Sequence, residues 1–297
     1  MQIQTDRNQK EIKIHGTYGF PVRVSHERLS DYERRSFMWH WHTELEWTYV
    51  LEGQIRYQVN EQVYELKPGQ GLLCNSNMLH SGHPVNDQDC HYVSITFHPR
   101  LLEGYKNSFL KEKYADRIVE NPSIPCLVLA SSGQWQETIL KSLQKIEYLY
   151  NHQKQETDYD FQIYLLLMDV WRIVCRHVHK TQDNPADAKN IDRLKQILTY
   201  IHGHYQEKIT LDDIAAEVNI CPSECCRFFK KHMRESLFDY LLNFRIEQSL
   251  ELLSRESGNI TEAAIQCGFS SSSYFSRVFR ERMGYSPREY QKLTRSD

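Results

Sequence analysis

The 297-residue chain carries 36 lysine and arginine residues against 39 aspartate and glutamate residues, a formal net charge of −3. This length suits about two domains of roughly 150 residues, with cores that need no disulfide or structural metal. Hydrophobic residues make up 40% of the chain, which excludes a disordered acidic tail, and the charge balance excludes a polycation. A DNA-binding protein is not excluded, because binding needs only a local basic surface.

The N-terminus and the cysteines indicate the cellular location of the protein. The first sixteen residues are polar and lack the apolar core of a secretory signal. The most apolar stretch, residues 161–175, is interrupted by charged residues and is too short to span a bilayer. Eight cysteines are scattered along the chain, a pattern typical of reduced thiols. We therefore expect a cytoplasmic protein with no membrane partner.

Residues 20–98 alternate short apolar runs with turn signals. Residues 47–51 and 55–59, for example, are two such runs separated by a Glu-Gly pair. Short strands at regular spacing are typical of an all-β sandwich or barrel. We therefore expect a β domain over residues 1–133.

A histidine-rich segment lies within this β region. It contains His40, His42 and Glu46, with Gly53 seven positions later, and His80 follows after a Pro-Gly turn. On one strand, residues 40, 42 and 46 would share a face, because side chains alternate with period two. The spacing resembles the first motif of the cupin superfamily of β-barrels, and His80 falls near the histidine of the second motif. The resemblance implies that all four side chains point into a barrel.

Three interpretations of these four residues stay open. They form a metal-free pocket for a polar effector, a pocket that holds a divalent metal on the same residues, or a structural histidine cluster. Three imidazoles and one carboxylate suit a divalent transition metal. However, Asn77 and Leu79 replace the proline and glycine usual around the second motif. We therefore favour the metal-free pocket and expect no cofactor.

Apolar residues recur at helical spacing over residues 134–180. The helices of this segment are expected to pack on the barrel, over three tryptophans that alternate with the histidine face: Trp39, Trp41 and Trp47. Two roles stay open, a dimer interface or internal packing, for an apolar face made by Ile163, Leu166, Val170, Trp171 and Val174. Residues 181–190 are polar or small, contain a proline and lack periodicity, so they are expected to form a linker.

Residues 191–297 are expected to be helical and contain an internal repeat. Residues 213–230 match residues 262–280 at an offset of 49 to 50 positions. Each copy combines a short apolar stripe, a turn and a second helix, with Pro222 at a helix start and Gly268 at a turn. Two copies of one unit are the simplest explanation, and the unit has the profile of a helix-turn-helix.

The repeat resembles the DNA-binding domain of the AraC/XylS family of bacterial transcription regulators. The similarity covers roughly residues 191–292 and is carried chiefly by residues 267–280 and 283–290. It implies that a long helix, about residues 237–254, joins the two helix-turn-helix units so that they enter successive major grooves. The first copy departs from the pattern, because Cys221 replaces a helix-capping serine and Arg234 a glycine. We expect the first unit to be the looser one.

The face of each second helix opposite the core is expected to contact DNA. In the first unit these residues are Ser223, Cys226, Arg227, Lys230 and Lys231. In the second unit they are Ser272, Ser273, Ser276, Arg277 and Arg280. Arginine can contact guanine bidentately, and serine can contact bases or phosphates. The alternative is a solvated charged face. Residues 191–297 hold 15 basic and 15 acidic residues, which predicts modest non-specific affinity.

The sequence therefore predicts a two-domain α+β protein: a cupin-like β-barrel with flanking helices, then an all-α domain of two helix-turn-helix units. The expected function is a DNA-binding transcription regulator that senses a small molecule, a sugar or a related metabolite. Its expected partners are an operator duplex, the effector, a second copy in a homodimer and, for an activator, RNA polymerase. The rival is a cupin-type metalloenzyme, an isomerase or dioxygenase, but an enzyme has no need of the repeat, and no catalytic residue is assigned.

Overall fold

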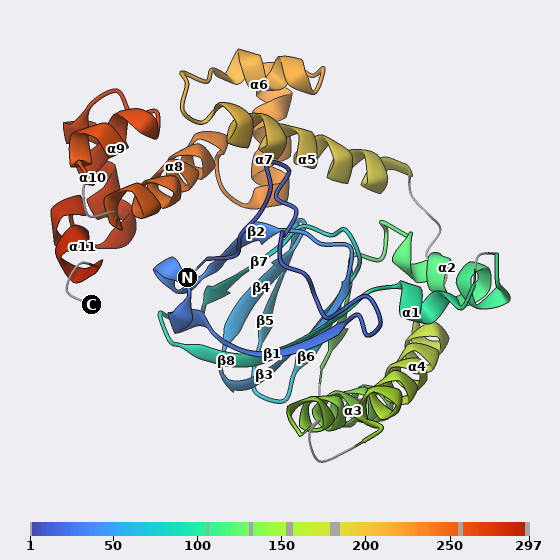
Figure 1. The fold of residues 1–297 in the computed structure, drawn as a ribbon. Helices are drawn as coiled ribbons and strands as arrows, with labels where there is room; N and C mark the ends of the chain where they lie inside the picture. The colour runs from blue at the N-terminus through green and yellow to red at the C-terminus, as the bar shows by residue number, and fades with distance from the viewer. Residues whose placement is uncertain are drawn as a thin grey trace. The chain divides into compact units, whose positions relative to one another are not determined.

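The computed structural model describes residues 2–105, 107–130, 133–152, 157–178, 185–254 and 258–294. The chain divides into two compact units, residues 1–191 and residues 192–297. The first unit contains two antiparallel sheets with flanking helices, and the described part of the second unit is built from helices (Figure 1). The expected α+β class is confirmed.

Two sheets face each other in the first unit (Figure 1). The five-stranded sheet has the spatial order β1 (Val22–Arg28), β8 (Cys90–Phe97), β3 (Leu45–Gly53), β6 (Gly71–Cys74) and β9 (Cys126–Leu129). The four-stranded sheet has the order β2 (Phe37–His40), β7 (His80–Pro84), β4 (Ile55–Val59) and β5 (Gln62–Leu66). Within the described residues no strand ladder joins the two sheets. The cupin-like barrel is therefore open, where the sequence suggested a closed one.

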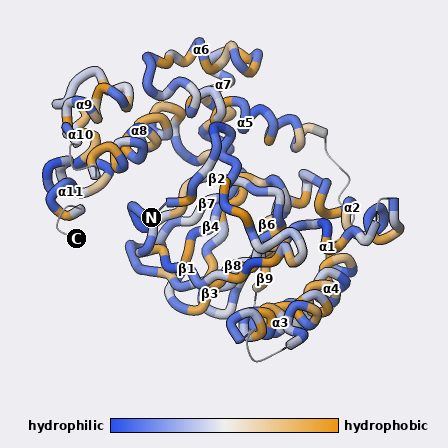
Figure 2. The backbone as a smooth tube through the Cα atoms, viewed as in Figure 1, coloured by the Kyte–Doolittle hydropathy of each residue, from blue (hydrophilic) through white to orange (hydrophobic). Residues whose placement is uncertain are grey.

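Helices α3 (Gln134–Asn151) and α4 (Tyr159–His177) cover the five-stranded sheet (Figure 1). Hydrophobic and hydrophilic residues are interspersed along both helices, as Figure 2 shows. Their apolar side chains share one core with Trp47, which is fully buried. Trp39 and Trp41 do not belong to this core, so the prediction for the three tryptophans holds only for Trp47. Trp41 instead donates its indole N–H to the carbonyl of Asn8 at 2.7 Å.

The apolar face of α4 packs internally. Ile163, Val170 and Val174 are at most 1% exposed, Trp171 is 5% exposed, and all four belong to the core shared with the five-stranded sheet. Leu166 is partly buried against the same core. Of the two roles that the sequence left open for this face, packing within the chain is therefore the one observed. Among the described helices, none is both long and apolar enough to cross a membrane.

The expected linker is partly helical. Helix α5 (Pro185–His204) includes residues 185–190, and residues 181–184 lie outside the described part of the chain. A proline suits a first helical position, and the acidic Asp187 in the first turn suits the positive end of the helix dipole. These start signals outweigh the polar composition that suggested a linker. Between β8 and β9 lie three short helical segments: α1 (Arg100–Glu103), a π-helical turn (Lys111–Ala115) and α2 (Asp116–Val119).

The second unit contains the predicted pair of helix-turn-helix motifs. The first is α6 (Leu211–Glu217) with α7 (Pro222–Met233), and the second is α9 (Ile260–Gln266) with α10 (Ser272–Met283). Helix α8 (Leu237–Ser254) lies between them in the chain at the expected bounds, and α11 (Pro287–Thr294) follows. In the second motif Ala263 and Ala264 are buried against α8 and α10. Small side chains there let the helices approach closely.

The ends of the two recognition helices, α7 and α10, differ. Ser271 caps α10 by accepting a hydrogen bond from the backbone N–H of Tyr274, whereas Cys221 makes no side-chain cap hydrogen bond at α7. At the other ends, the left-handed backbone conformation is adopted by Gly284 (φ 83°) after α10 and by Arg234 (φ 62°) after α7. The first recognition helix therefore lacks the favourable residue at both ends.

The Gly284→Ala variant tests the left-handed position after α10. A Cβ there meets no atom within 4 Å, so the cost is backbone strain alone, about 1 kcal/mol. Urea unfolding of the full chain, followed by circular dichroism at 222 nm, should show this loss. All five tryptophans lie in the first unit, at positions 39, 41, 47, 135 and 171, so the fluorescence transition should stay unchanged.

Gly203→Ala is the matched control, because Gly203 lies inside α5 and its Cβ would also meet nothing within 4 Å. Alanine is favoured over glycine within a helix, so this variant should be neutral or more stable by up to about 1 kcal/mol. Equal destabilisation by both substitutions would contradict the conformational argument.

Candidate ligand pocket and nucleic-acid interface

Three histidines meet inside the first unit. His40 ends β2 and His80 begins β7, and the two residues are direct partners in the antiparallel register. His42 lies in the loop after β2, and Glu46 lies on β3 of the opposite sheet. The prediction that residues 40, 42 and 46 lie on a single strand is therefore wrong, because the chain leaves one sheet after His40 and enters the other before Glu46. The four residues nevertheless come together.

The three imidazoles are buried and are oriented in the same way. Their exposed fractions are 3% for His40, 3% for His42 and 1% for His80. In each ring Nδ1 lies near a backbone carbonyl oxygen: Met38 at 2.8 Å, Glu44 at 3.1 Å and Met78 at 2.9 Å, respectively. A carbonyl only accepts, so Nδ1 carries a hydrogen, and in the neutral ring Nε2 keeps its lone pair. One ring nitrogen from each histidine lies within 4.8 Å of the others.

Two hydroxyl groups hold the buried carboxyl group of Glu46 through one of its oxygens. Its Oε1 accepts hydrogen bonds from the hydroxyls of Thr48 at 3.0 Å and Tyr57 at 2.9 Å. Its Oε2 lies 3.4 Å from Nε2 of His42. Burial acts to raise the pKa of Glu46, but His42 and the neighbouring imidazoles outweigh it and hold the pKa well below the usual value. Burial lowers the pKa of His40 and that of His80. For His42, burial acts to lower the pKa, but the Glu46 carboxylate outweighs burial and raises it. The site thus sets two imidazoles whose neutral form is favoured beside a His42–Glu46 pair whose charged forms favour each other.

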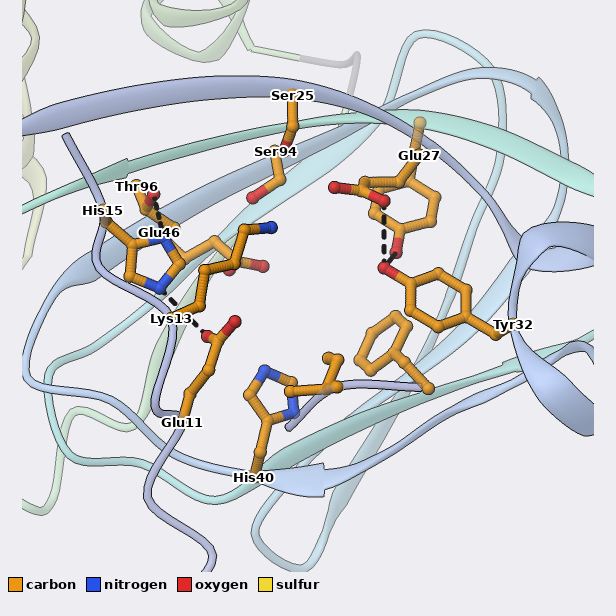
Figure 3. Close-up of a pocket in the computed structure, with 13 residues that line it drawn as sticks. Glu11, Lys13, His15, Ser25, Glu27, Tyr32, His40, Glu46, Ser94 and Thr96 are labelled. Carbon is orange, nitrogen blue, oxygen red and sulfur yellow. Dashed lines mark hydrogen bonds and ion pairs between the residues drawn. The ribbon is translucent and has the colours of Figure 1, made fainter. Parts of the chain in front are cut away.

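A pocket lies beside the cluster, with His40 and Glu46 in its wall, and its volume of about 410 Å³ includes space that is open to solvent. Figure 3 shows that the polar groups around the pocket come from separate parts of the chain: Glu11, Lys13, His15, Ser25, Glu27, Tyr32, Ser94 and Thr96. The histidine cluster and the pocket therefore form one continuous site.

Hydrogen bonds fix several of these groups in place (Figure 3). Nε2 of His15 lies 3.0 Å from the Glu11 carboxylate, and Nδ1 of His15 lies 2.9 Å from the Thr96 hydroxyl. The Tyr32 hydroxyl donates to Glu27 at 3.0 Å. Burial acts to raise the pKa of Glu11, but His15 and the nearby histidines reverse the effect and lower it. The pocket therefore offers ordered carboxylates and hydroxyls.

Sequence reasoning missed most of the pocket wall. Ser25 and Glu27 lie two residues apart on β1, so the alternation of that strand could have placed them on one face. Glu11 and His15 belong to an N-terminal segment without periodicity. That segment is held by non-local contacts, such as the backbone N–H of Glu11 on the carbonyl of Trp41 at 2.9 Å, which no local pattern reveals.

The second unit carries the residues predicted to contact DNA on the surfaces of α7 and α10. Eight of them are exposed: Ser223, Cys226, Arg227, Lys230, Lys231, Ser273, Arg277 and Arg280. Ser272 and Ser276 are half-buried. The opposite faces are core, with Cys225 and Phe229 buried on α7 and Phe275 and Phe279 buried on α10. Each recognition helix thus presents a polar, basic face to solvent.

Two further features concern these helices. Phe228 on α7 is only half-buried, unlike its neighbour Phe229, and the guanidinium of Arg193 lies 5.3 Å from its ring centroid. All eight cysteines are free, as expected for a chain without a disulfide framework. Among them Cys221 and Cys226 are exposed on or beside α7.

Comparison with known proteins supports two functional domains. An AraC-like ligand binding domain model matches residues 26–152, and a helix-turn-helix domain model matches residues 214–293. The chain is 32% identical over 288 residues to the uncharacterized HTH-type transcriptional regulator YdeC of Bacillus subtilis, covering 97% of each chain. It is 21% identical to the melibiose operon regulatory protein of Escherichia coli, covering 86% of this chain and 83% of that protein.

Among solved structures, ToxT from Vibrio cholerae aligns over 92% of this chain and 98% of its own, at 15% identity and a TM-score of 0.40. The relatives are transcription regulators rather than enzymes. The chain carries both the ligand-binding and the helix-turn-helix domains, and it matches a full-length regulator above 30% identity. It therefore belongs to the AraC/XylS family of transcription regulators.

Proposed function

We propose that this regulator binds a small polar effector in the pocket of the first unit and reads an operator with α7 and α10. The observation that carries the proposal is the pocket, where ordered carboxylates and hydroxyls line a space of about 410 Å³. Effector binding alters DNA binding only if the effector prefers one arrangement of the protein over another. A homodimer, and RNA polymerase as partner of an activator, belong to the same proposal.

A sugar is the effector class that fits the lining best. Sugar hydroxyls donate to carboxylates and exchange hydrogen bonds with hydroxyls, and the pocket offers Glu11, Glu27, Ser25, Ser94 and Thr96 for such contacts. One relative is named for the melibiose operon. Glu46, with His40 beside it in the same wall, adds a further acceptor. We therefore propose His40, His42, Glu46 and His80 as part of the effector site.

We propose a functional division of the chain along the expected bounds. Residues 1–133 form the effector domain, residues 134–180 its packing helices, and residues 191–297 the DNA-binding domain. The proposed operator contacts on α7 are Ser223, Cys226, Arg227, Lys230 and Lys231. Those on α10 are Ser272, Ser273, Ser276, Arg277 and Arg280. Their solvent-facing positions opposite two packed cores support this assignment.

Arg277→Ala tests the recognition face of α10. Loss of a guanidinium that reads a guanine should weaken operator binding by roughly 1–3 kcal/mol and relax base preference at one position. Competitive binding to a set of operators with single-base changes measures both effects. Arg172→Ala is the matched control, because it removes an exposed arginine from the first unit, where Arg172 pairs with Asp169. Unchanged base preference in Arg277→Ala would contradict the assigned face.

Glu27→Gln tests the pocket. The amide keeps the shape and an acceptor for Tyr32 but removes the charge, so sugar binding should weaken by about tenfold or more. Thermal-shift screening of the full chain against monosaccharides and disaccharides identifies a ligand, because specific binding raises apparent stability. Calorimetry then compares the variant with Glu65→Gln, an exposed carboxylate on β5 paired with Arg56. Equal affinity in both variants would exclude Glu27 from the site.

A further inference from the structure

The geometry points to a metal site: we propose that His40, His42 and His80 bind one divalent transition metal ion through their Nε2 atoms, with the Glu46 carboxylate beside it. The proposed effector function does not require an ion, so this site goes beyond it. Among the described histidine, cysteine, aspartate and glutamate residues, only these three histidines form a group of three whose possible ligand atoms all lie within 4.8 Å of one another. Four observations carry the proposal.

The first is the way the rings are held. Each histidine uses Nδ1 on a backbone carbonyl, at 2.8 to 3.1 Å, which fixes both the tautomer and the ring plane. Metal-binding histidines commonly have such a partner on the nitrogen that does not bind the metal. A merely structural cluster needs no common orientation. Here three rings, carried by two strands and a loop, all turn Nδ1 toward a backbone carbonyl.

The second is the state of the Nε2 atoms. Those of His42 and His80 are buried and lack a hydrogen-bond partner in the described part of the chain. The neighbours of His80 are other rings: His40 at 4.0 Å and His42 at 5.0 Å between centroids, and Tyr57 stacked at 5.9 Å. Buried acceptors without donors destabilise a fold. A cation that accepts all three lone pairs removes this penalty.

The third is charge. Glu46 is a buried acidic residue, and its Oε2 lies 3.4 Å from Nε2 of His42. The lining of the adjoining pocket includes two more carboxylates, Glu11 and Glu27, against one lysine, Lys13. This surplus of negative charge favours a dication over an anion at this end of the pocket.

The fourth is the chemistry of the donors. Three imidazoles with a carboxylate suit zinc, iron, nickel, copper or cobalt, whereas magnesium and calcium prefer oxygen ligands alone. Three protein nitrogens also leave coordination positions that an oxygen of a bound molecule can fill. Because His40 and Glu46 line the pocket, such an ion would help to hold the effector, and this last step rests on the proposed function.

Cobalt titration of the full-length, untagged and chelator-treated protein tests the site. Co²⁺ is expected to bind with one-to-one stoichiometry and to give a visible absorption band, and excess Mg²⁺ should not remove it. The tryptophan-fluorescence unfolding midpoint should rise with the ion, since all five tryptophans lie in the first unit. Calorimetry with Zn²⁺ gives the stoichiometry independently.

His80→Gln and His40→Gln should each raise the dissociation constant by at least about 100-fold, since even the loss of an outer partner costs 10- to 100-fold. Glu46→Gln, which keeps all three imidazoles, should weaken binding less. His26→Ala is the control, because His26 forms an exposed pair with His91 at 3.2 Å and touches Glu147 outside the cluster. The unfolding transition of each metal-free variant shows whether that variant is folded. If a histidine variant is not folded, Glu46→Gln takes its place as the test of the site.

The outcomes separate the two proposals. Saturable one-to-one binding that is lost in the histidine variants and kept in His26→Ala supports the site. No saturable binding, or equal binding in the cluster variants and the parent, overturns it and leaves a structural histidine cluster. Operator and sugar binding by the metal-free protein are measured in parallel. If the protein binds operator and sugar but no metal, the metal site is wrong and the proposed function stands. If it binds metal but neither operator nor sugar, the metal site stands and the proposed function is wrong.

Discussion

The buried carboxylate of Glu46 is the interaction on which the first unit depends. A charged group inside a protein needs donors, and here they come from both sheets: Thr48 on its own strand and Tyr57 on β4 of the facing sheet. His42, in the loop between the sheets, lies beside the carboxylate, with its Nε2 3.4 Å from Oε2 of Glu46. The position of one sheet over the other is thus tied to a polar contact as well as to apolar packing.

In the second unit, Arg245 is the buried charged residue that holds separate segments together. It is buried on α8, and its guanidinium donates to the carbonyls of Tyr205 and Glu207, each at 2.7 Å. The same side chain reaches the turn of the second helix-turn-helix, where a Cβ on Gly268 would lie 2.9 Å from its Nη2. Gly268 has φ +77°, so both backbone and space require glycine there. One charged side chain therefore links the segment before α6 to the turn between α9 and α10.

Sequence reasoning succeeded where the signals were local. The two helix-turn-helix motifs follow from apolar stripes, turn residues and an internal repeat within one segment, and the bounds of α8 follow from the family resemblance. It failed where distant segments meet. The open barrel depends on which strands pair, and the N-terminal segment carries Glu11 and His15 to the pocket through contacts with residues 41 and 96. The start of α5 shows a third case, in which a polar composition hid helix-start signals.

In the candidate site, one part of the sequence-based prediction is correct and another part is wrong. His40, His42, Glu46 and His80 were selected by spacing, and the structure gathers them, yet the strand that was expected to align three of them does not exist. The spacing reflects a chain that crosses from β2 to β3 and returns at β7. A motif can therefore identify the members of a site while its simplest geometric explanation is wrong. The common Nδ1 contacts of the histidines come from backbone carbonyls and leave no trace in the sequence.

The unequal ends of the two recognition helices bear on the symmetry of DNA reading. Helix α10 begins at a serine cap and ends at a glycine, whereas α7 begins at a cysteine and ends at an arginine in the left-handed conformation. In the proposed DNA complex, α10 binds with both ends stabilised, whereas α7 binds without a side-chain cap and with a non-glycine residue in the left-handed conformation. Two half-sites with equally good base contacts would then differ in affinity, so the repeat in the protein does not require a symmetric operator.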